Sequence, residues 1–124
     1  MEAINTTILI AEDNASNYKL LEIVLSKEYN LIHAWNGEEA VELFKEHHPQ
    51  LILMDIGMPI MNGYEATREI RKIAPTVPII GLTAYAYASD EQEGIECGMN
   101  EYVTKPANIA KLRVRIKELI EDVK

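Results

Sequence analysis

Short apolar runs alternate along the chain with longer stretches in which apolar residues recur every three or four positions. The run Leu-Ile-Leu-Met-Asp at 51–55 is apolar on both faces of an extended segment, and Pro59 follows shortly afterwards. Such a run is typical of a strand that is buried on both sides in a parallel sheet. Comparable runs predict further strands at residues 7–11, 29–35, 77–82 and 101–104.

The stretches that follow these strands have the apolar spacing of helices that cover a sheet. Asn14 can cap the first helix, Asn36-Gly37 and Asn62-Gly63 begin the next two, and Gly98 can end the fourth. These signals predict helices at residues 15–26, 36–48, 62–74, 89–97 and 107–124.

Regular alternation of strands and helices requires a parallel sheet with right-handed crossovers and helices on both faces. We predict one α/β domain over residues 1–124, because no linker or repeat divides the sequence and this length can bury a sizeable core. The flavodoxin-like, doubly wound order 2-1-3-4-5 fits a five-stranded sheet. It makes the strands at 7–11 and 51–55 neighbours, and ligands bind such sheets at the carboxyl ends of the strands.

Ionisable and hydroxyl side chains gather at those carboxyl ends. Glu12 and Asp13 follow the first strand, Asp55 ends the third, and Thr83 and Lys105 follow the fourth and fifth. Neighbouring strands lie ~4.8 Å apart, so Asp13 and Asp55 are expected to lie close together. Crowded carboxylates repel one another, and Mg²⁺ would offset this repulsion because it prefers carboxylate and phosphate oxygens as ligands.

A transition-metal site is not expected, because its cysteine and histidine ligands would have to be neighbours. Cys97, His33, His47 and His48 are instead scattered among helices and an edge strand. We interpret Cys97 as a small packed residue and His47-His48 as a solvated helix end.

An aspartate beside Mg²⁺, a lysine and a threonine hydroxyl is equipped to accept a phosphoryl group. A carboxylate oxygen of Asp55 would attack phosphorus as a covalent nucleophile. Mg²⁺ and Lys105 would neutralise charge in the transition state, and Thr83 would hydrogen-bond a phosphoryl oxygen. Each residue alone has an ordinary explanation at a strand end, so the prediction depends on the whole set.

Composition limits the partners and the location of the domain. The net charge of −8 argues against nucleic acid as a partner, because phosphate contacts need a basic face. No apolar run approaches the ~20 residues of a membrane helix, so this domain is not expected to enter a membrane. The amino terminus lacks a secretory pattern and Cys97 is the single cysteine, which together favour a cytoplasmic location.

Four segments of the sequence together resemble the receiver domain of two-component response regulators, and the resemblance covers essentially the whole chain. They are Glu12-Asp13, Met54-Asp55-Ile-Gly-Met-Pro-Ile-Met-Asn-Gly63, Leu82-Thr83-Ala84 and Tyr102-Val-Thr-Lys105-Pro106. Residues 58–71 and 98–102 are most similar to the receivers of hybrid sensor histidine kinases. The resemblance implies a phosphorelay, in which a histidine kinase or a histidine phosphotransfer domain supplies the phosphoryl group.

The resemblance also implies roles for the clustered residues. Asp55 would be the phosphoacceptor, and Lys105 would pair with the phosphate. Asp13, Asp55 and the Gly57 backbone carbonyl would hold Mg²⁺, while Glu12 would help through water.

A conformational switch is implied as well. Thr83 and Tyr102 would form the switch pair, and phosphorylation would alter the surface around the fourth helix, the last strand and the last helix. Lys105-Pro106 is expected to be a cis peptide bond, because X-Pro bonds lose most of the preference for trans.

Three residues depart from the usual receiver pattern. Gly57, two residues after the acceptor, lacks a side chain that often lines the approach to the phosphate, and Tyr85, two residues after the switch threonine, is bulky. Both are expected to tune the lifetime of the phosphorylated state. Ala107 stands where a large apolar residue usually follows Lys-Pro, so the anchoring of the last helix is expected to differ.

The resemblance implies a domain that catalyses its own phosphorylation and dephosphorylation without being a turnover enzyme alone. The chain would be a stand-alone receiver, a piece of a longer regulator or the last domain of a hybrid kinase. In a hybrid protein the parent would be a histidine kinase, and the domain would lie in its cytoplasmic part. A homodimer is a further open alternative.

Three other classes of function stay open. A phosphate-independent interaction module would keep the fold without needing the acids, the threonine and the lysine. A haloacid-dehalogenase-like phosphatase also uses an aspartate nucleophile and Mg²⁺, but it would want a second aspartate where this chain has Gly57. A nucleotide-binding flavodoxin-like protein fits less well, because Glu12-Asp-Asn-Ala-Ser16 is acidic where a glycine-rich phosphate loop should stand.

Overall fold

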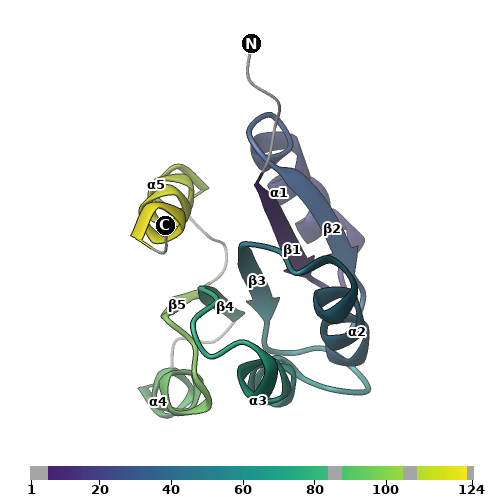
Figure 1. Cartoon of the computed structure of the whole chain (residues 1–124), viewed down its shortest axis with the longest axis vertical. Coiled ribbons are helices and arrows are strands. Elements are labelled where there is room, and N and C mark those ends of the chain that lie inside the picture. Colours follow the sequence, from purple (N-terminus) through teal and green to yellow (C-terminus); the bar gives the residue numbers. More distant parts are fainter. Residues whose placement is uncertain (1–5, 84–87, 105–108, 123–124) are drawn as a thin grey trace.

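The computed structural model describes residues 6–83, 88–104 and 109–122, in which strands and helices alternate along the chain (Figure 1). The elements are β1 (Thr7–Ala11), α1 (Ala15–Leu25), β2 (Asn30–Ala34), α2 (Gly37–His47), β3 (Leu51–Asp55), α3 (Gly63–Ile73), β4 (Ile79–Thr83), α4 (Ala88–Cys97), β5 (Glu101–Thr104) and α5 (Ile109–Asp122). The five-stranded parallel sheet has the order β2-β1-β3-β4-β5. The predicted flavodoxin-like fold and strand order are confirmed.

Two apolar clusters form the core, one on each face of the sheet. Helices α1 and α5 cover one face, and α2, α3 and α4 cover the other (Figure 1). Because successive side chains of a strand point to opposite faces, Leu9 packs under α2 and α3, whereas Ile8 and Ile10 pack under α1 and α5. All residues of β3 are buried, as the apolar run at 51–55 predicts. Among the helices of the described ranges, none is long and apolar enough to cross a bilayer.

The limits of β4 differ most from the prediction. The strand begins at Ile79 rather than at residue 77, and it ends at Thr83. Pro78 lies just before the strand, where its carbonyl accepts a hydrogen bond from the Ile52 N–H at 3.0 Å. A proline can accept in this way but cannot donate, which explains why the strand starts after it. The other ends that fall within the described residues agree with the prediction to within one residue.

The predicted helix caps are present. The side chains of Asn14, Asn36 and Asn62 each accept a hydrogen bond from the backbone N–H three residues later, at 2.8 to 3.0 Å. At α3 the capping is reciprocal, because the Asn62 N–H donates to Glu65 Oε1 at 3.1 Å. Gly98 follows the end of α4 with a φ of +114°, a conformation that favours glycine.

Arg71 joins the end of α3 to the turn between α4 and β5. Its Nε donates to the Gly98 carbonyl at 2.8 Å, and its Nη2 donates to Asn100 Oδ1 at 2.9 Å. The same Asn100 oxygen accepts a hydrogen bond from the Ile79 N–H at 2.9 Å. The turn is therefore fixed both to α3 and to the beginning of β4.

The backbone of the loop after β3 lies directly against the backbone of two glycines, Gly37 and Gly63. The Gly63 N–H donates to the Ile56 carbonyl at 3.1 Å, and a Cβ at Gly63 would lie 2.3 Å from the Asp55 carbonyl oxygen. The Gly37 N–H donates to the Met61 carbonyl at 2.9 Å, and a Cβ at Gly37 would lie 2.2 Å from that oxygen. Helices α2 and α3 thus begin at glycines because a side chain at either position would push the loop away.

We expect Gly63→Ala to lower the free energy of unfolding by about 2 kcal/mol, because the new methyl group has no room beside rigid backbone. Gly57→Ala is the matched control. A Cβ at Gly57 would meet nothing within 4 Å, and the change should be less than about 1 kcal/mol. Urea unfolding of both variants measures the difference, and equal stabilities would contradict this account of the loop.

Candidate functional site

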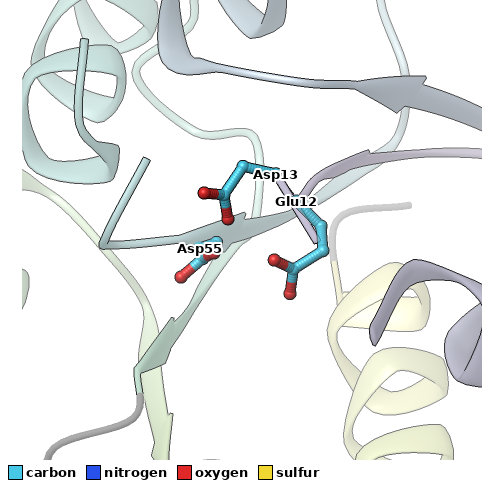
Figure 2. A group of neighbouring side chains, drawn as sticks. All are labelled: Glu12, Asp13 and Asp55. Carbon is cyan, nitrogen blue, oxygen red and sulfur yellow. The ribbon is translucent and has the colours of Figure 1, made fainter. Parts of the chain in front are cut away.

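The carboxylates of Glu12, Asp13 and Asp55 lie together at the carboxyl ends of β1 and β3 (Figure 2). One oxygen from each of the three side chains lies within 4.8 Å of the other two. Glu12 is fully buried, Asp55 is 5% exposed, and Asp13 lies on the exposed side. Direct pairing of β1 with β3 produces this cluster, so the expected proximity of Asp13 and Asp55 is confirmed.

Backbone groups hold the two buried acids in place. The Glu12 N–H donates to the Ala34 carbonyl at 2.9 Å, and Glu12 Oε2 accepts from the Asn14 N–H at 3.2 Å. Asp55 Oδ1 accepts from the Gly57 N–H, also at 3.2 Å. The cluster is therefore arranged as a set of carboxylate acceptors.

This cluster fits a small, hard divalent cation. Mg²⁺ takes oxygen ligands, uses one or two carboxylates and keeps several waters or phosphate oxygens. The two buried acids supply oxygens on the inside, and the exposed side near Asp13 leaves the remaining positions accessible to water or phosphate. Within the described residues, this is the one group of three metal-ligating side chains whose ligand atoms lie so close together.

Open space surrounds the position that a side chain at Gly57 would occupy. An added Cβ at Gly57 would meet no atom within 4 Å, so a side chain there would not displace the loop. The role of Gly57 in leaving the approach to Asp55 open stays a prediction, as does its effect on the lifetime of a phosphorylated state.

Thr83 ends the strand next to Asp55. Asp55 pairs with Leu82 across β3 and β4, and Thr83 is the following residue, 3% exposed. Because side chains alternate along a strand, Thr83 faces the same side of the sheet as Gly81. Tyr102 of β5 packs against that side, since a Cβ at Gly81 would lie 3.3 Å from Tyr102 Cδ2. The two predicted switch residues therefore share one face of the sheet.

The ring of Tyr102 is half-buried between β4, α3 and α4. A Cβ at Gly94, inside α4, would lie 2.8 Å from Tyr102 Cδ2, so the glycine makes room for the ring. Glycine in a helix interior costs about 1 kcal/mol relative to alanine, and here it is explained by this contact. The Tyr102 hydroxyl lies 3.4 Å from the Tyr64 hydroxyl of α3. No motif of the sequence singles out Tyr64 or Gly94.

Four residues of interest lie outside the described residues. They are Tyr85, Lys105, Pro106 and Ala107. The phosphate-pairing role of Lys105, the cis bond before Pro106 and the effects of Tyr85 and Ala107 therefore stay predictions.

Cys97 and His33, neither of which is a predicted metal ligand, both have defined surroundings in the structure. Cys97 packs in the core at 6% exposure, and burial raises the pKa of its thiol, so its interpretation as a small packed residue is confirmed. The sequence indicates no site role for His33, yet its Nε2 lies 2.8 Å from the Glu12 carbonyl oxygen. The sequence holds only a weak signal for this contact, because His33 stands opposite Ile10 on an edge strand.

The sequence profile of the response regulator receiver domain matches residues 8–117. Together with the fold and the acid cluster, this match shows that the chain belongs to the response regulator receiver family. It is a receiver domain of two-component signalling. Receiver domains bind Mg²⁺ at their acidic pocket, which agrees with the cluster found here.

Curated relatives of the chain include regulators and kinases. A probable transcriptional regulator, ycf27 of Porphyridium aerugineum, is 41% identical over 94% of this chain and 48% of its own length. The polar-differentiation response regulator DivK of Brucella ovis is 34% identical over 94% of this chain and 97% of its own length. Histidine kinase P4 of Formosa agariphila is 35% identical over 94% of this chain and 9% of its own length. The chain spans about half the length of the ycf27 regulator.

Solved receiver structures superimpose closely. The receiver domain of the Francisella response regulator 1452 has a TM-score of 0.90 at 26% identity and covers 97% of this chain and 100% of its own. The Saccharomyces cerevisiae Ssk1 receiver was solved with the histidine phosphotransfer protein Ypd1. It has a TM-score of 0.85 at 34% identity, and the match covers 92% of this chain and 88% of that chain. A chain of the CheX–CheY complex of Borrelia burgdorferi with BeF3 and Mg²⁺ has a TM-score of 0.85 at 28% identity. The match covers 94% of this chain and 90% of that chain.

Crowding of the three acids makes a prediction about stability. In Mg²⁺-free buffer, Asp13→Asn should raise the melting temperature by several degrees, because it relieves repulsion of the two buried carboxylates. Mg²⁺ should stabilise the wild type, since binding to the folded state adds to stability, and should stabilise the variant much less. Thermal melts with and without Mg²⁺ measure both effects.

The matched control is Glu42→Gln, which removes the same charge from an exposed position of α2. It should change neither the melting temperature nor the response to Mg²⁺. An Asp13→Asn variant that behaves like this control would show that the three acids do not form one site.

Proposed function

We propose that Asp55 accepts a phosphoryl group from a phosphohistidine, with Mg²⁺ held by Asp13, Asp55 and the Gly57 carbonyl, and with Glu12 acting through water. The observation that supports this most is the convergence of three carboxylates within 4.8 Å at adjacent strand ends. Acids held so close need a cation, and a phosphoryl group is the ligand that Mg²⁺ best shares with carboxylates.

The reaction is an in-line displacement at phosphorus. A carboxylate oxygen of Asp55 forms a bond to phosphorus while the bond from phosphorus to the histidine nitrogen breaks, and the imidazole leaves with the electron pair and takes up a proton. The cation supplies charge neutralisation for the phosphoryl oxygens. Asp55 is oriented for attack by its bond from the Gly57 N–H, and Lys105 pairs with a phosphoryl oxygen. Attack by water on the acyl phosphate later restores Asp55 and releases inorganic phosphate.

The phosphorylated state acts through Thr83 and Tyr102. A phosphoryl oxygen on Asp55 draws the Thr83 hydroxyl toward it, because Thr83 follows the residue paired with Asp55. Tyr102 lies on the same face of the sheet, so movement of Thr83 changes the space available to its ring. The ring then alters the surface formed by α4, β5 and α5 by a shift of populations.

The partner is a protein that carries the phosphohistidine, either a histidine kinase or a histidine phosphotransfer domain. A complex of that kind is described for the Ssk1 receiver with Ypd1, which supports the same class of partner here. The net charge of −8 favours protein over nucleic acid as the direct partner. The similarity to a segment of histidine kinase P4 would fit a hybrid kinase as the parent protein. The similarity to ycf27 would fit a longer regulator as the parent protein.

Incubation with Mg²⁺ and acetyl phosphate should add the mass of one phosphoryl group to the wild type, measured on the intact protein. Asp55→Asn should gain none, because an amide is not a nucleophile of this kind, although its shape is nearly the same. Chelation of Mg²⁺ should abolish the gain, and the control Glu42→Gln should be labelled like the wild type.

A wild-type protein that is folded and gains no mass would contradict the phosphoacceptor role and favour a phosphate-independent interaction module. A gain that persists in Asp55→Asn would place the acceptor elsewhere. Multiple turnover of a phosphate ester would instead favour a phosphatase.

The switch is tested by Thr83→Ala with Thr83→Ser as its control. Both variants lose the methyl group, but only the serine keeps the hydroxyl that would bond the phosphoryl oxygen. All three proteins should be labelled at Asp55, whereas the ring resonances of Tyr102 should respond to phosphorylation only in the wild type and in Thr83→Ser. A full response in Thr83→Ala would contradict the switch.

A further inference from the structure

The ring of His33, on an edge strand of the sheet, contacts two other aromatic rings. Its imidazole is parallel to the ring of Tyr18 of α1, with a centroid distance of 3.7 Å and an interplanar angle of 2°. The ring of Trp35 is tilted against it, with a centroid distance of 4.1 Å and an interplanar angle of 37°. These two ring contacts restrict the rotation of the His33 ring and the direction of its nitrogen atoms.

The fixed ring places His33 Nε2 2.8 Å from the Glu12 carbonyl oxygen. A carbonyl oxygen accepts hydrogen bonds only, so Nε2 must carry the hydrogen and donate. β2 ends at Ala34, one residue after His33. The His33 side chain therefore continues the attachment of β1 to β2 where the pairing of the two strands ends.

This bond completes a two-point attachment of Glu12 to β2. The Glu12 N–H donates to the Ala34 carbonyl at 2.9 Å, and the Glu12 carbonyl accepts from His33. The carbonyl of Glu12 and the N–H of Asp13 belong to one planar peptide unit. Fixing that carbonyl therefore fixes the peptide plane from which the Asp13 backbone departs and restricts where its side chain begins.

We propose that His33 is a positioning residue for magnesium binding: its Nε2–H holds the Glu12-Asp13 peptide so that Asp13 is directed toward Asp55. The inference rests on the proposed function, because it concerns the same acids. Asp13 needs this help most, because the other two acids are buried and held by their surroundings, whereas Asp13 is exposed. Groups that orient metal ligands in this way change metal affinity without contacting the metal.

The decisive comparison is His33→Gln with His33→Met. Both side chains are unbranched and of similar length, and both remove the stacked ring. The glutamine amide nitrogen can reach the place of Nε2 and donate, whereas the methionine cannot. His33→Phe is the complementary variant, since it keeps a ring for stacking and removes the donor.

Mg²⁺ binding is measured by titration at constant ionic strength, followed by the backbone amide resonances around Asp55. We expect His33→Met and His33→Phe to bind Mg²⁺ about tenfold more weakly than the wild type. His33→Gln should remain within about twofold of it, because the donor is restored. Thermal melts without Mg²⁺ show whether each variant is folded.

A second readout reports on the bond itself. A hydrogen bond to a carbonyl polarises the peptide unit, so the Asp13 amide resonance of the Mg²⁺-free protein should move in His33→Met and His33→Phe and stay near its wild-type position in His33→Gln. A role of His33 in packing alone would affect His33→Gln as much as His33→Met.

The outcomes separate the two proposals. Wild-type affinity in His33→Met, or equal weakening in His33→Gln and His33→Met, would overturn the positioning role and leave the proposed function intact. A wild type that does not bind Mg²⁺ would overturn both. If His33→Phe unfolds, the pair His33→Gln and His33→Met still decides the question.

Discussion

Mutual repulsion among Glu12, Asp13 and Asp55 is the constraint on which the arrangement of the site depends. Parallel pairing of β1 with β3 brings these acids to one edge, and two of them are almost completely removed from water. Isolated side chains would separate, but the buried strands and the backbone donors around them do not allow it. The folded chain therefore maintains an electrostatic repulsion that a bound cation can relieve, and this makes the site responsive to Mg²⁺.

The fold and the acid cluster could be predicted because both depend on local and regular signals. The all-apolar run of β3 indicates a central strand, and alternation with helices restricts the sheet to very few strand orders. Once the order is known, Asp13 and Asp55 must be neighbours. The caps at Asn14, Asn36 and Asn62 are equally local, since each involves a residue and the first turn that follows it.

The contacts that the sequence did not reveal join residues without any periodic relation. His33 reads as an ordinary residue of an edge strand, and only the packing of α1 on β2 shows that Tyr18 stacks on it. From the sequence alone, Gly94 would only be expected to destabilise its helix. The ring of Tyr102, which lies beside it, explains why a glycine is needed there. The early start predicted for β4 has a simpler reason, because the apolar run includes Pro78, which cannot donate to the sheet.

The attachment of Arg71 to the turn after α4 has a consequence for how a signal can leave the domain. Arg71 and Asn100 fix the carboxyl end of α4 to α3 and to β4, by bonds of 2.8 to 2.9 Å. A rearrangement of α4 would thus be a rotation about that fixed end, with displacements that grow toward the amino end of the helix. An effector protein docked over the amino-terminal half would detect the rotation, whereas one docked over the turn would find nearly the same surface in both states.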